Sequence, residues 1–351
     1  MKNDLRSMDL QEMEQLVTGY GFPRFRAKQL FAWIHEKQVE NFDQITNLGK
    51  DILEMIKEST YIDKLALVKR QSAKDGTEKF LLSLSDNNYI ECVLMKYRGS
   101  KSKQRNTLCI SSQVGCAMGC GFCATGLGGF TRNLKTGEVL SQVYFANNFL
   151  LHEYPQGGQV GNIVFMGMGE PLLNLANVIK AIKLLNSPQG QNIGIRRIAI
   201  STCGIVPRIV ELADMDLDIV LAVSLHAPTN ELRSQIMPVN KQHDLQELKK
   251  ACQYYIEKTG NRITFEYAVV DNFNDSKQHA VKLAQYLRGM LCHVNIIPVN
   301  PVNSSYNRPA SQKVKFFLRI LLENNIEASI REEKGVDIDA ACGQLRGKVV
   351  E

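Results

Sequence analysis

The chain has 351 residues, of which 44% are hydrophobic and 22% charged, a balance typical of a globular protein with a sizeable core. No apolar run approaches the roughly 18–20 residues of a membrane span, and no apolar stretch typical of a signal peptide opens the chain, so we expect a protein without a membrane anchor. The net charge of +6 is compatible with nucleic-acid binding, but many basic proteins bind none.

The first part of the chain, residues 1–58, is predicted to be helical. Leu10, Met13 and Val17 recur at the spacing of one helix face, and a further amphipathic helix is expected over 50–59. This part reads as a small accessory domain. Its basic residues either contact phosphates or form a solvated face.

From residue 59 to 104 the apolar period changes to two, which predicts a short antiparallel sheet that links the helices to the rest. Glu91 lies on the third of these strands. Residues 96–105 contain five basic and no acidic side chains, together with Gly and Ser, so we expect a loop. This loop either binds phosphate groups or is simply solvated, and the sequence alone does not separate the two interpretations.

Strands and helices then alternate through residue 332, and the strands are nearly continuous apolar runs, as expected when both faces are covered. The expected strands are 107–111, 162–166, 197–201, 218–224, 262–270 and 293–297, with a last short one ending at Arg331. The expected helices are 136–151, 175–186, 206–213, 244–259, 276–288 and 312–324. Such βα units in series predict a parallel sheet, but the period alone does not separate a doubly wound sheet from an open barrel.

The chain contains nine cysteines, a number that favours a reducing compartment and ligand chemistry, so we expect a cytoplasmic protein. Three of them, Cys116, Cys120 and Cys123, have the spacing C-x3-C-x2-C in a glycine-rich stretch. Thiolates so close together indicate an iron–sulfur cluster, and three ligands on a four-iron cluster leave one iron open. A structural zinc site is a second alternative, but zinc usually takes four ligands in paired spacings, and the sequence has no second cysteine pair of this kind. A redox pair at Cys120 and Cys123 is a third alternative.

Polar or glycine-rich segments follow four of the expected strands, at 166–171, 201–204, 224–228 and 298–301. In barrels and parallel sheets, chemistry gathers at the carboxyl ends of the strands. Glu170 could hold an ammonium group, and Ser201 a ribose or a carboxylate. His226 alone would more often be a structural histidine. Because all four segments fall at the same ends of successive strands, we expect a binding site there.

These segments together resemble the RlmN/Cfr family of radical S-adenosylmethionine (SAM) RNA methyltransferases. The resemblance rests on residues 109–134 and on the motifs M-G-M-G-E-P-L-L-N, S-T-C-G, S-L-H-A-P and D-I-D-A-A-C-G-Q-L, and it covers essentially the whole chain. It implies an α/β fold, an open (β/α)6 radical SAM partial barrel with a small N-terminal helical accessory domain and a short linking β-sheet. We accordingly divide the chain into an accessory domain at 1–58, a linking sheet and basic loop at 59–104, a barrel core at 105–332 and a C-terminal loop at 333–351.

The resemblance also implies a two-stage reaction. The family methylates a ring carbon of adenine, which is electron-poor, so simple displacement on the electrophilic methyl of SAM should fail. Two SAM molecules are used per turnover, together with one 4Fe-4S cluster. One SAM methylates a cysteine. The second is cleaved reductively to a radical that takes hydrogen from the S-methyl group, and the carbon radical adds to adenine. Another cysteine then helps break the protein–RNA link and forms a disulfide.

Family roles are carried over to matching positions of this sequence. The cluster ligands match Cys116, Cys120 and Cys123, and the SAM-binding positions match Gly169, Glu170, Ser201, Ser224, Leu225, His226 and Asn300. The methylated cysteine matches Cys342, the resolving cysteine Cys109 and the proposed proton acceptor Glu91. The remaining cysteines are expected to be structural: Cys92, Cys203, Cys252 and Cys292.

The motifs G-G-F-T-R-N-L, G-E-P-L-L-N and I-I-P-V-N-P look like the RlmN version. This implies methylation at C2 of an adenosine in 23S rRNA near the peptidyl-transferase centre, and of the adenosine beside the anticodon in some tRNAs. Alternatives are Cfr-type C8 methylation, which confers ribosomal antibiotic resistance, a radical SAM enzyme for another substrate, and a non-catalytic RNA-binding protein with a metal. Further expectations are an electron donor such as flavodoxin and a monomeric state.

Overall fold

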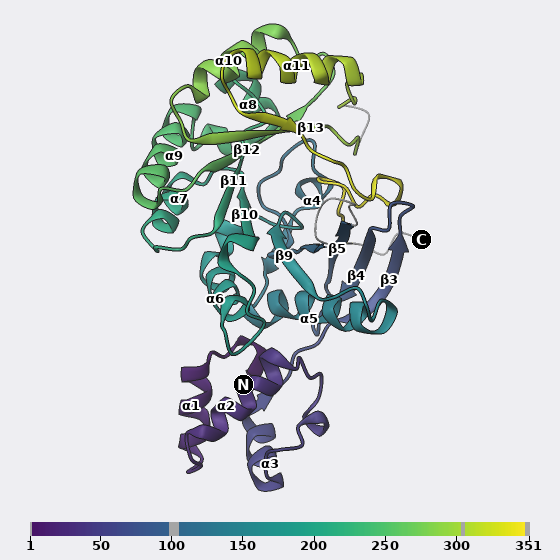
Figure 1. The fold of residues 1–351 in the computed structure, drawn as a ribbon, viewed down its shortest axis with the longest axis vertical. Helices are drawn as coiled ribbons and strands as arrows, with labels where there is room; N and C mark the ends of the chain where they lie inside the picture. Colours follow the sequence, from purple (N-terminus) through teal and green to yellow (C-terminus); the bar gives the residue numbers. More distant parts are fainter. Residues whose placement is uncertain (1, 98–104, 303–305, 348–351) are drawn as a thin grey trace.

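The computed structural model describes residues 2–97, 105–302 and 306–347. Most of the expected basic loop, residues 98–104, therefore lies outside the described residues. The N-terminal helices α1 (Leu10–Gly19), α2 (Phe25–Phe31) and α3 (Lys50–Ser59) form a separate lobe, drawn in purple and blue in Figure 1. Asp9 begins α1 with a capping box, because its carboxylate accepts from the N–H of Glu12 while Glu12 accepts from the N–H of Asp9. These helices confirm the prediction for this part of the chain.

Within the described ranges, one sheet contains ten strands in the order β14-β13-β12-β11-β10-β9-β6-β5-β4-β3. Its parallel strands are β6 (Arg105–Cys109), β9 (Val160–Phe165), β10 (Ile198–Thr202), β11 (Val220–Ser224), β12 (Ile263–Val269), β13 (Cys292–Pro298) and β14 (Ala328–Ile330). The antiparallel strands are β3 (Ala66–Ser72), β4 (Glu78–Ser83) and β5 (Tyr89–Tyr97). Because β5 pairs with β6, the linking strands continue the main sheet and do not form a sheet of their own.

Long helices connect successive parallel strands and cover the outside of the sheet (Figure 1). They are α5 (Thr136–Glu153), α6 (Leu175–Asn186), α7 (Val206–Ala213), α9 (Leu245–Thr259), α10 (Lys277–Leu287) and α11 (Ser311–Glu323). Each expected helix is found, with bounds within one or two residues. The sequence did not predict the short helices α4 (Ala124–Leu127) and α8 (Asn230–Ile236), or the hairpin of β7 (Gln113–Gly115) and β8 (Phe130–Asn133).

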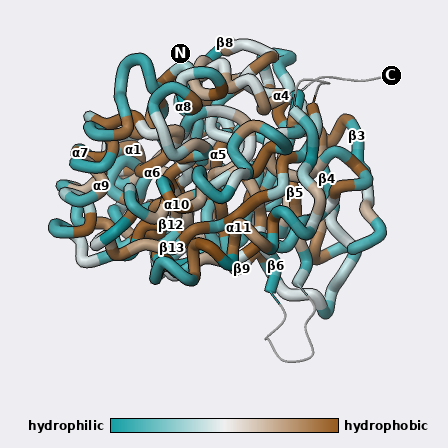
Figure 2. The backbone as a smooth tube through the Cα atoms, turned by 90° about the horizontal axis from the view of Figure 1, so that it is seen from above, coloured by the Kyte–Doolittle hydropathy of each residue, from teal (hydrophilic) through white to brown (hydrophobic). Residues whose placement is uncertain are grey.

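The core follows the parallel strands. Seen from above, hydrophobic residues concentrate along β9, β12 and β13, and hydrophilic ones lie toward the rim (Figure 2). Buried apolar side chains of the sheet and of its covering helices form one cluster that also reaches the N-terminal lobe. None of the helices in the described part of the chain is long and apolar enough to span a membrane.

The N-terminal lobe is fixed to α5 by buried polar contacts. Arg6 donates to Ser141 Oγ at 2.7 Å, and His35 Nδ1 lies 2.8 Å from the Tyr144 hydroxyl. The strand β1 (Asn3–Asp4) also pairs with β2 (Thr60–Tyr61), so the two ends of the lobe are joined beside the sheet. As a result, α5 is covered on one side by the sheet and on another by the lobe.

Candidate active site

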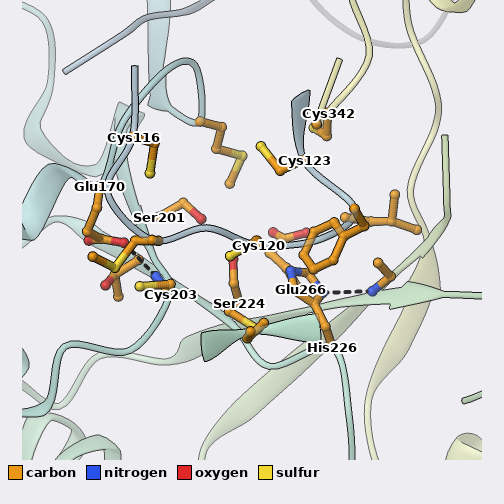
Figure 3. Close-up of a pocket in the computed structure, with 18 of the residues that line it drawn as sticks. Cys116, Cys120, Cys123, Glu170, Ser201, Cys203, Ser224, His226, Glu266 and Cys342 are labelled. Atoms are coloured by element: carbon orange, nitrogen blue, oxygen red, sulfur yellow. Dashed lines mark hydrogen bonds between the residues drawn. The ribbon is translucent and has the colours of Figure 1, made fainter. Parts of the chain in front are cut away.

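A cavity of about 160 Å³ lies at the carboxyl ends of the parallel strands (Figure 3). It brings together three parts of the chain: the cysteine loop, the strand ends and the C-terminal loop. The predicted site residues in its lining are Cys116, Cys120, Cys123, Gly169, Glu170, Ser201, Ser224, His226, Asn300 and Cys342. Cys116 and Cys342, more than two hundred residues apart in the chain, thus line the same cavity.

The three cysteines of the loop surround a common space in Figure 3, with their sulfur atoms turned toward it. The loop is anchored where the N–H of Cys116 donates to the carbonyl of Gly129 at 2.7 Å. At Gly115, which has φ +72°, a Cβ would overlap that same carbonyl group, so only glycine allows the close approach. The anchor therefore holds the first cysteine at the wall of the cavity.

The donor set fits an iron–sulfur cluster. Burial raises the pKa of Cys116 to about 12, so an uncompensated thiolate is unfavourable and a bound cation would stabilise it. Nowhere in residues 2–97, 105–302 and 306–347 do three His, Cys, Asp or Glu side chains approach closely enough to hold a single metal ion. Three cysteine thiols in the lining of one cavity suit a cluster, because each of its cysteines binds a different iron atom.

Glu170 is buried at the end of β9 and is held by backbone N–H groups. Its carboxylate accepts from Leu172 at 3.0 Å and from Cys203 at 2.7 Å. Burial raises the pKa of Glu170, and these hydrogen bonds oppose the rise. At the preceding Gly169, which has φ +100°, a Cβ would lie 2.5 Å from the Cβ of Gln113, so the tight turn that aims Glu170 needs glycine.

The side chain of His226 is neutral and oriented by the backbone. The N–H of Ala268 donates to its Nδ1 at 2.9 Å, so the ring proton is on Nε2. Burial lowers the pKa of His226 to about 3. Ser201 and Ser224, near the carboxyl ends of β10 and β11, also line the cavity, with Ser201 on the side of Glu170 (Figure 3). Leu225 is fully buried and its side chain is not part of the described lining of the cavity.

Cys342 stands between this cavity and a smaller one of about 40 Å³, since it lines both. Cys109 lines the smaller cavity. Burial raises the pKa of Cys109 to about 12, and the nearby Cys342 adds to the rise. The side-chain amide of Asn300 donates to the carbonyl of Cys342 at 3.4 Å. All nine cysteines lie in the described ranges and are free thiols, so the disulfide expected during turnover is not present here.

Glu91 lies outside the described linings of these two cavities. Its carboxylate lies under the C-terminal loop and accepts from the N–H groups of Arg346 and Gly347.

Sequence reasoning missed three charged residues, of which Glu266 and Arg233 are buried and Arg331 is partly buried. Glu266 and Arg331 line the main cavity and form an ion pair at 3.5 Å. Arg233 donates to the carbonyls of Cys203, Ser224 and Leu225, and so ties the ends of two strands together. The sequence did contain a signal for Glu266, because a carboxylate inside the apolar strand β12 is unusual. It contained no such signal for Arg233, which lies on the unpredicted helix α8.

The comparisons with known proteins agree with this geometry. Residues 110–284 match the radical SAM superfamily, and residues 3–62 match the ribosomal RNA large subunit methyltransferase N-terminal domain. A probable dual-specificity RNA methyltransferase RlmN from Thermotoga neapolitana is 49% identical over 99% of this chain and 98% of its own. A protein of the same name from Thermoanaerobacter sp. is 46% identical over 98% of each chain.

A crystal structure of a radical SAM methyltransferase from Sphaerobacter thermophilus superposes with a TM-score of 0.92 at 42% identity, over 99% of this chain and 100% of that one. The fold is therefore that of a radical SAM methyltransferase, which confirms the expected α/β partial barrel. Within that superfamily, the chain belongs to the RlmN family of methyltransferases, as the sequence motifs implied.

Proposed function

We propose that this enzyme methylates C2 of an adenosine in 23S rRNA near the peptidyl-transferase centre, and of the adenosine beside the anticodon in some tRNAs, through an S-methylcysteine. The observation that carries the proposal is the place of Cys342, which lines both the cavity of the cysteine loop and the cavity of Cys109. One residue there can meet a methyl donor on one side and a nucleobase on the other.

The cofactors we propose are one 4Fe-4S cluster, bound by Cys116, Cys120 and Cys123, and SAM, used twice per turnover. The bound cluster supplies the electron for reductive cleavage of SAM. The residues proposed to hold SAM are Gly169, Glu170, Ser201, Ser224, Leu225, His226 and Asn300. Glu170 supports this role because its buried carboxylate can pair with an ammonium group. Leu225 acts through its backbone, which Arg233 holds in place.

Cys342 would accept the first methyl group from SAM by displacement. Its thiol would lose a proton to solvent, its sulfur would bond to the methyl carbon, and S-adenosylhomocysteine would leave with the electron pair of the broken C–S bond. Cys109 would then attack the sulfur of Cys342 in the protein–RNA adduct. The S–S bond would form as the bond from sulfur to the transferred carbon breaks, and the electron pair of that bond, with a proton, would complete the methyl group on adenine. Their proximity supports this division of work, since the charge of Cys342 affects the pKa of Cys109. We keep the division of the chain into 1–58, 59–104, 105–332 and 333–351 as part of the proposal.

We also propose a cytoplasmic monomer that takes its electrons from a donor such as flavodoxin. Methylation at C8 is not favoured, because the relatives described above are named RlmN. Mass spectrometry of the nucleosides decides between the carbons. Anaerobically reconstituted enzyme, incubated with rRNA or tRNA, SAM and a reductant, is expected to yield 2-methyladenosine. A product methylated at C8, or RNA that carries no new methyl group, would contradict the proposal.

Substitution of the two cysteines separates their roles. Cys342→Ala is expected to abolish RNA methylation while the iron content stays unchanged, because the ligand loop is intact. Cys109→Ala is expected to accumulate a covalent protein–RNA adduct, visible on a denaturing gel, because release of the product needs the second thiol. Residual methylation by the first variant, or no adduct with the second while Cys342 still becomes methylated, would overturn these roles.

A further inference from the structure

Glu91 and Lys79 contact the C-terminal loop at two separate points. Glu91 Oε2 accepts hydrogen bonds from the N–H groups of Arg346, at 2.5 Å, and Gly347, at 2.9 Å. Glu91 Oε1 lies 3.4 Å from Lys79 Nζ, and that ammonium group donates to the carbonyl of Asp339 at 3.2 Å. One ion pair therefore holds the loop on both sides of its cysteine.

The register of the sheet explains why these two residues meet. In the antiparallel pair of β4 and β5, Lys79 lies opposite Val93, and Glu91 is two residues from Val93. Lys79 and Glu91 are thus diagonal neighbours on one face. Their side chains are only 9% and 7% exposed. Both strands belong to the ten-stranded sheet, so the two side chains project from regular, hydrogen-bonded backbone.

The loop side of the contact requires glycine. Gly347 has φ +61°, and a Cβ there would overlap the terminal methyl of Met168 and lie 3.1 Å from the carbonyl of Tyr89. Only a residue without a side chain lets this N–H reach Glu91. The contact between Glu91 and the N–H of Gly347 therefore depends on a residue of β5 and on a glycine of the loop.

We propose that Glu91 and Lys79 form a latch that positions Cys342 by holding residues 339–347 against β4 and β5. In this role Glu91 is a positioning residue. The inference rests on the proposed function, in which Cys342 carries the methyl group. It follows from the bonds of the Glu91 carboxylate, which already binds two N–H groups and an ammonium, and from its place outside the described linings of both cavities.

Hydrogen–deuterium exchange on the purified full chain, without RNA, tests the latch directly. Glu91→Ala and Lys79→Met are expected to speed exchange at the amides of Arg346 and Gly347 on the order of tenfold or more, because each variant weakens hydrogen bonds to a charged group. Lys79→Arg keeps the charge and should restore protection. Unchanged protection in both Glu91→Ala and Lys79→Met would overturn the proposal.

A matched control comes from the same two strands. Lys96 on β5 and Glu78 on β4 form an ion pair of 3.3 Å, with side chains 7% and 2% exposed. Lys96→Met therefore removes an equally buried pair, and it should leave the loop amides protected. Gly347→Ala provides an independent route, because it displaces the loop while Glu91 and Lys79 stay intact. It should reproduce the fast exchange, and the proposal remains testable if Glu91→Ala does not fold.

Methylation of Cys342 distinguishes the latch from a proton acceptor. Mass spectrometry of the peptide with Cys342, after incubation with SAM and reductant, should show methylation about tenfold slower in Glu91→Ala and Lys79→Met. Normal methylation, protected loop amides and a trapped protein–RNA adduct in Glu91→Ala would instead identify a proton acceptor and sink the latch. If even the unaltered chain leaves Cys342 unmethylated, the proposed function fails, while the exchange data still decide whether the latch exists.

Discussion

Asp63 lies buried where the N-terminal lobe meets α5, and one of its carboxylate oxygens has no hydrogen-bond partner in the described structure. Burial and the charges of Asp4 and Glu138 raise the pKa of Asp63 to about 6, from an ordinary 3.8. The charged form is therefore less favourable in the folded than in the unfolded chain. This penalty is absent below about pH 3, grows between the ordinary pKa of 3.8 and the raised value of about 6, and is then constant.

Asp63→Asn is expected to stabilise the protein by on the order of 2 kcal/mol at pH 8, because the amide carries no charge. The gain should vanish below about pH 3, where Asp63 is protonated in both states. Urea unfolding at a series of pH values measures this. Asp43→Asn is the control, because that carboxylate is 90% exposed, and it should change little at any pH. Equal or lower stability of Asp63→Asn at pH 8 would contradict the argument.

The helix α5 shows how one element is fitted between two others. Its second residue, Gly137, donates its N–H to Ser7 Oγ at 2.8 Å, and a Cβ there would overlap a carboxylate oxygen of Asp4. Replacing a helical glycine by alanine ordinarily stabilises a helix. At this position the added methyl group would push the N-terminal lobe away from the helix.

Gly137→Ala is therefore expected to destabilise the protein by about 1–3 kcal/mol, as overpacking does. Gly19 is the matched control. It ends α1, and a Cβ there would meet no atom within 4 Å. Gly19→Ala should gain about 0.5 kcal/mol or be neutral. Denaturant unfolding measures the free energy of unfolding of the two variants. An increase in both would contradict the close contact between Gly137 and Asp4.

At the scale of the whole molecule, buried polar contacts join the N-terminal lobe to the barrel, so we expect the two to unfold together. Arg6 and His35 of the lobe are fully or almost fully buried against Ser141 and Tyr144 of α5. A chain that begins at residue 64 would leave these partners without hydrogen bonds and would expose one side of α5. We expect it to unfold several degrees lower in calorimetry, or to aggregate. An unchanged transition would show that the barrel is an independent domain.

The local elements could be predicted because their signals lie within short windows. The helices at 175–186 and 206–213 have the bounds that their apolar periodicity predicted. The three cysteines of the loop lie within eight residues, so their spacing alone indicated ligands. By contrast, α8 is too short for a periodic signal, and its buried Arg233 was missed together with the carbonyls that it binds.

The sequence by itself determined the order of strands and helices, the cysteine loop and the glycine-containing segments that follow the strands. Which of these meet was decided by the tertiary structure. Cys342 reaches the cysteine loop from the far end of the chain, and Glu91 turns toward the C-terminal loop and not toward the cavity. The physical reason is that periodicity and spacing act between neighbours in the chain, whereas the side-chain environment of Glu91 depends on the register of β4 with β5 and on the path of a loop some 250 residues later.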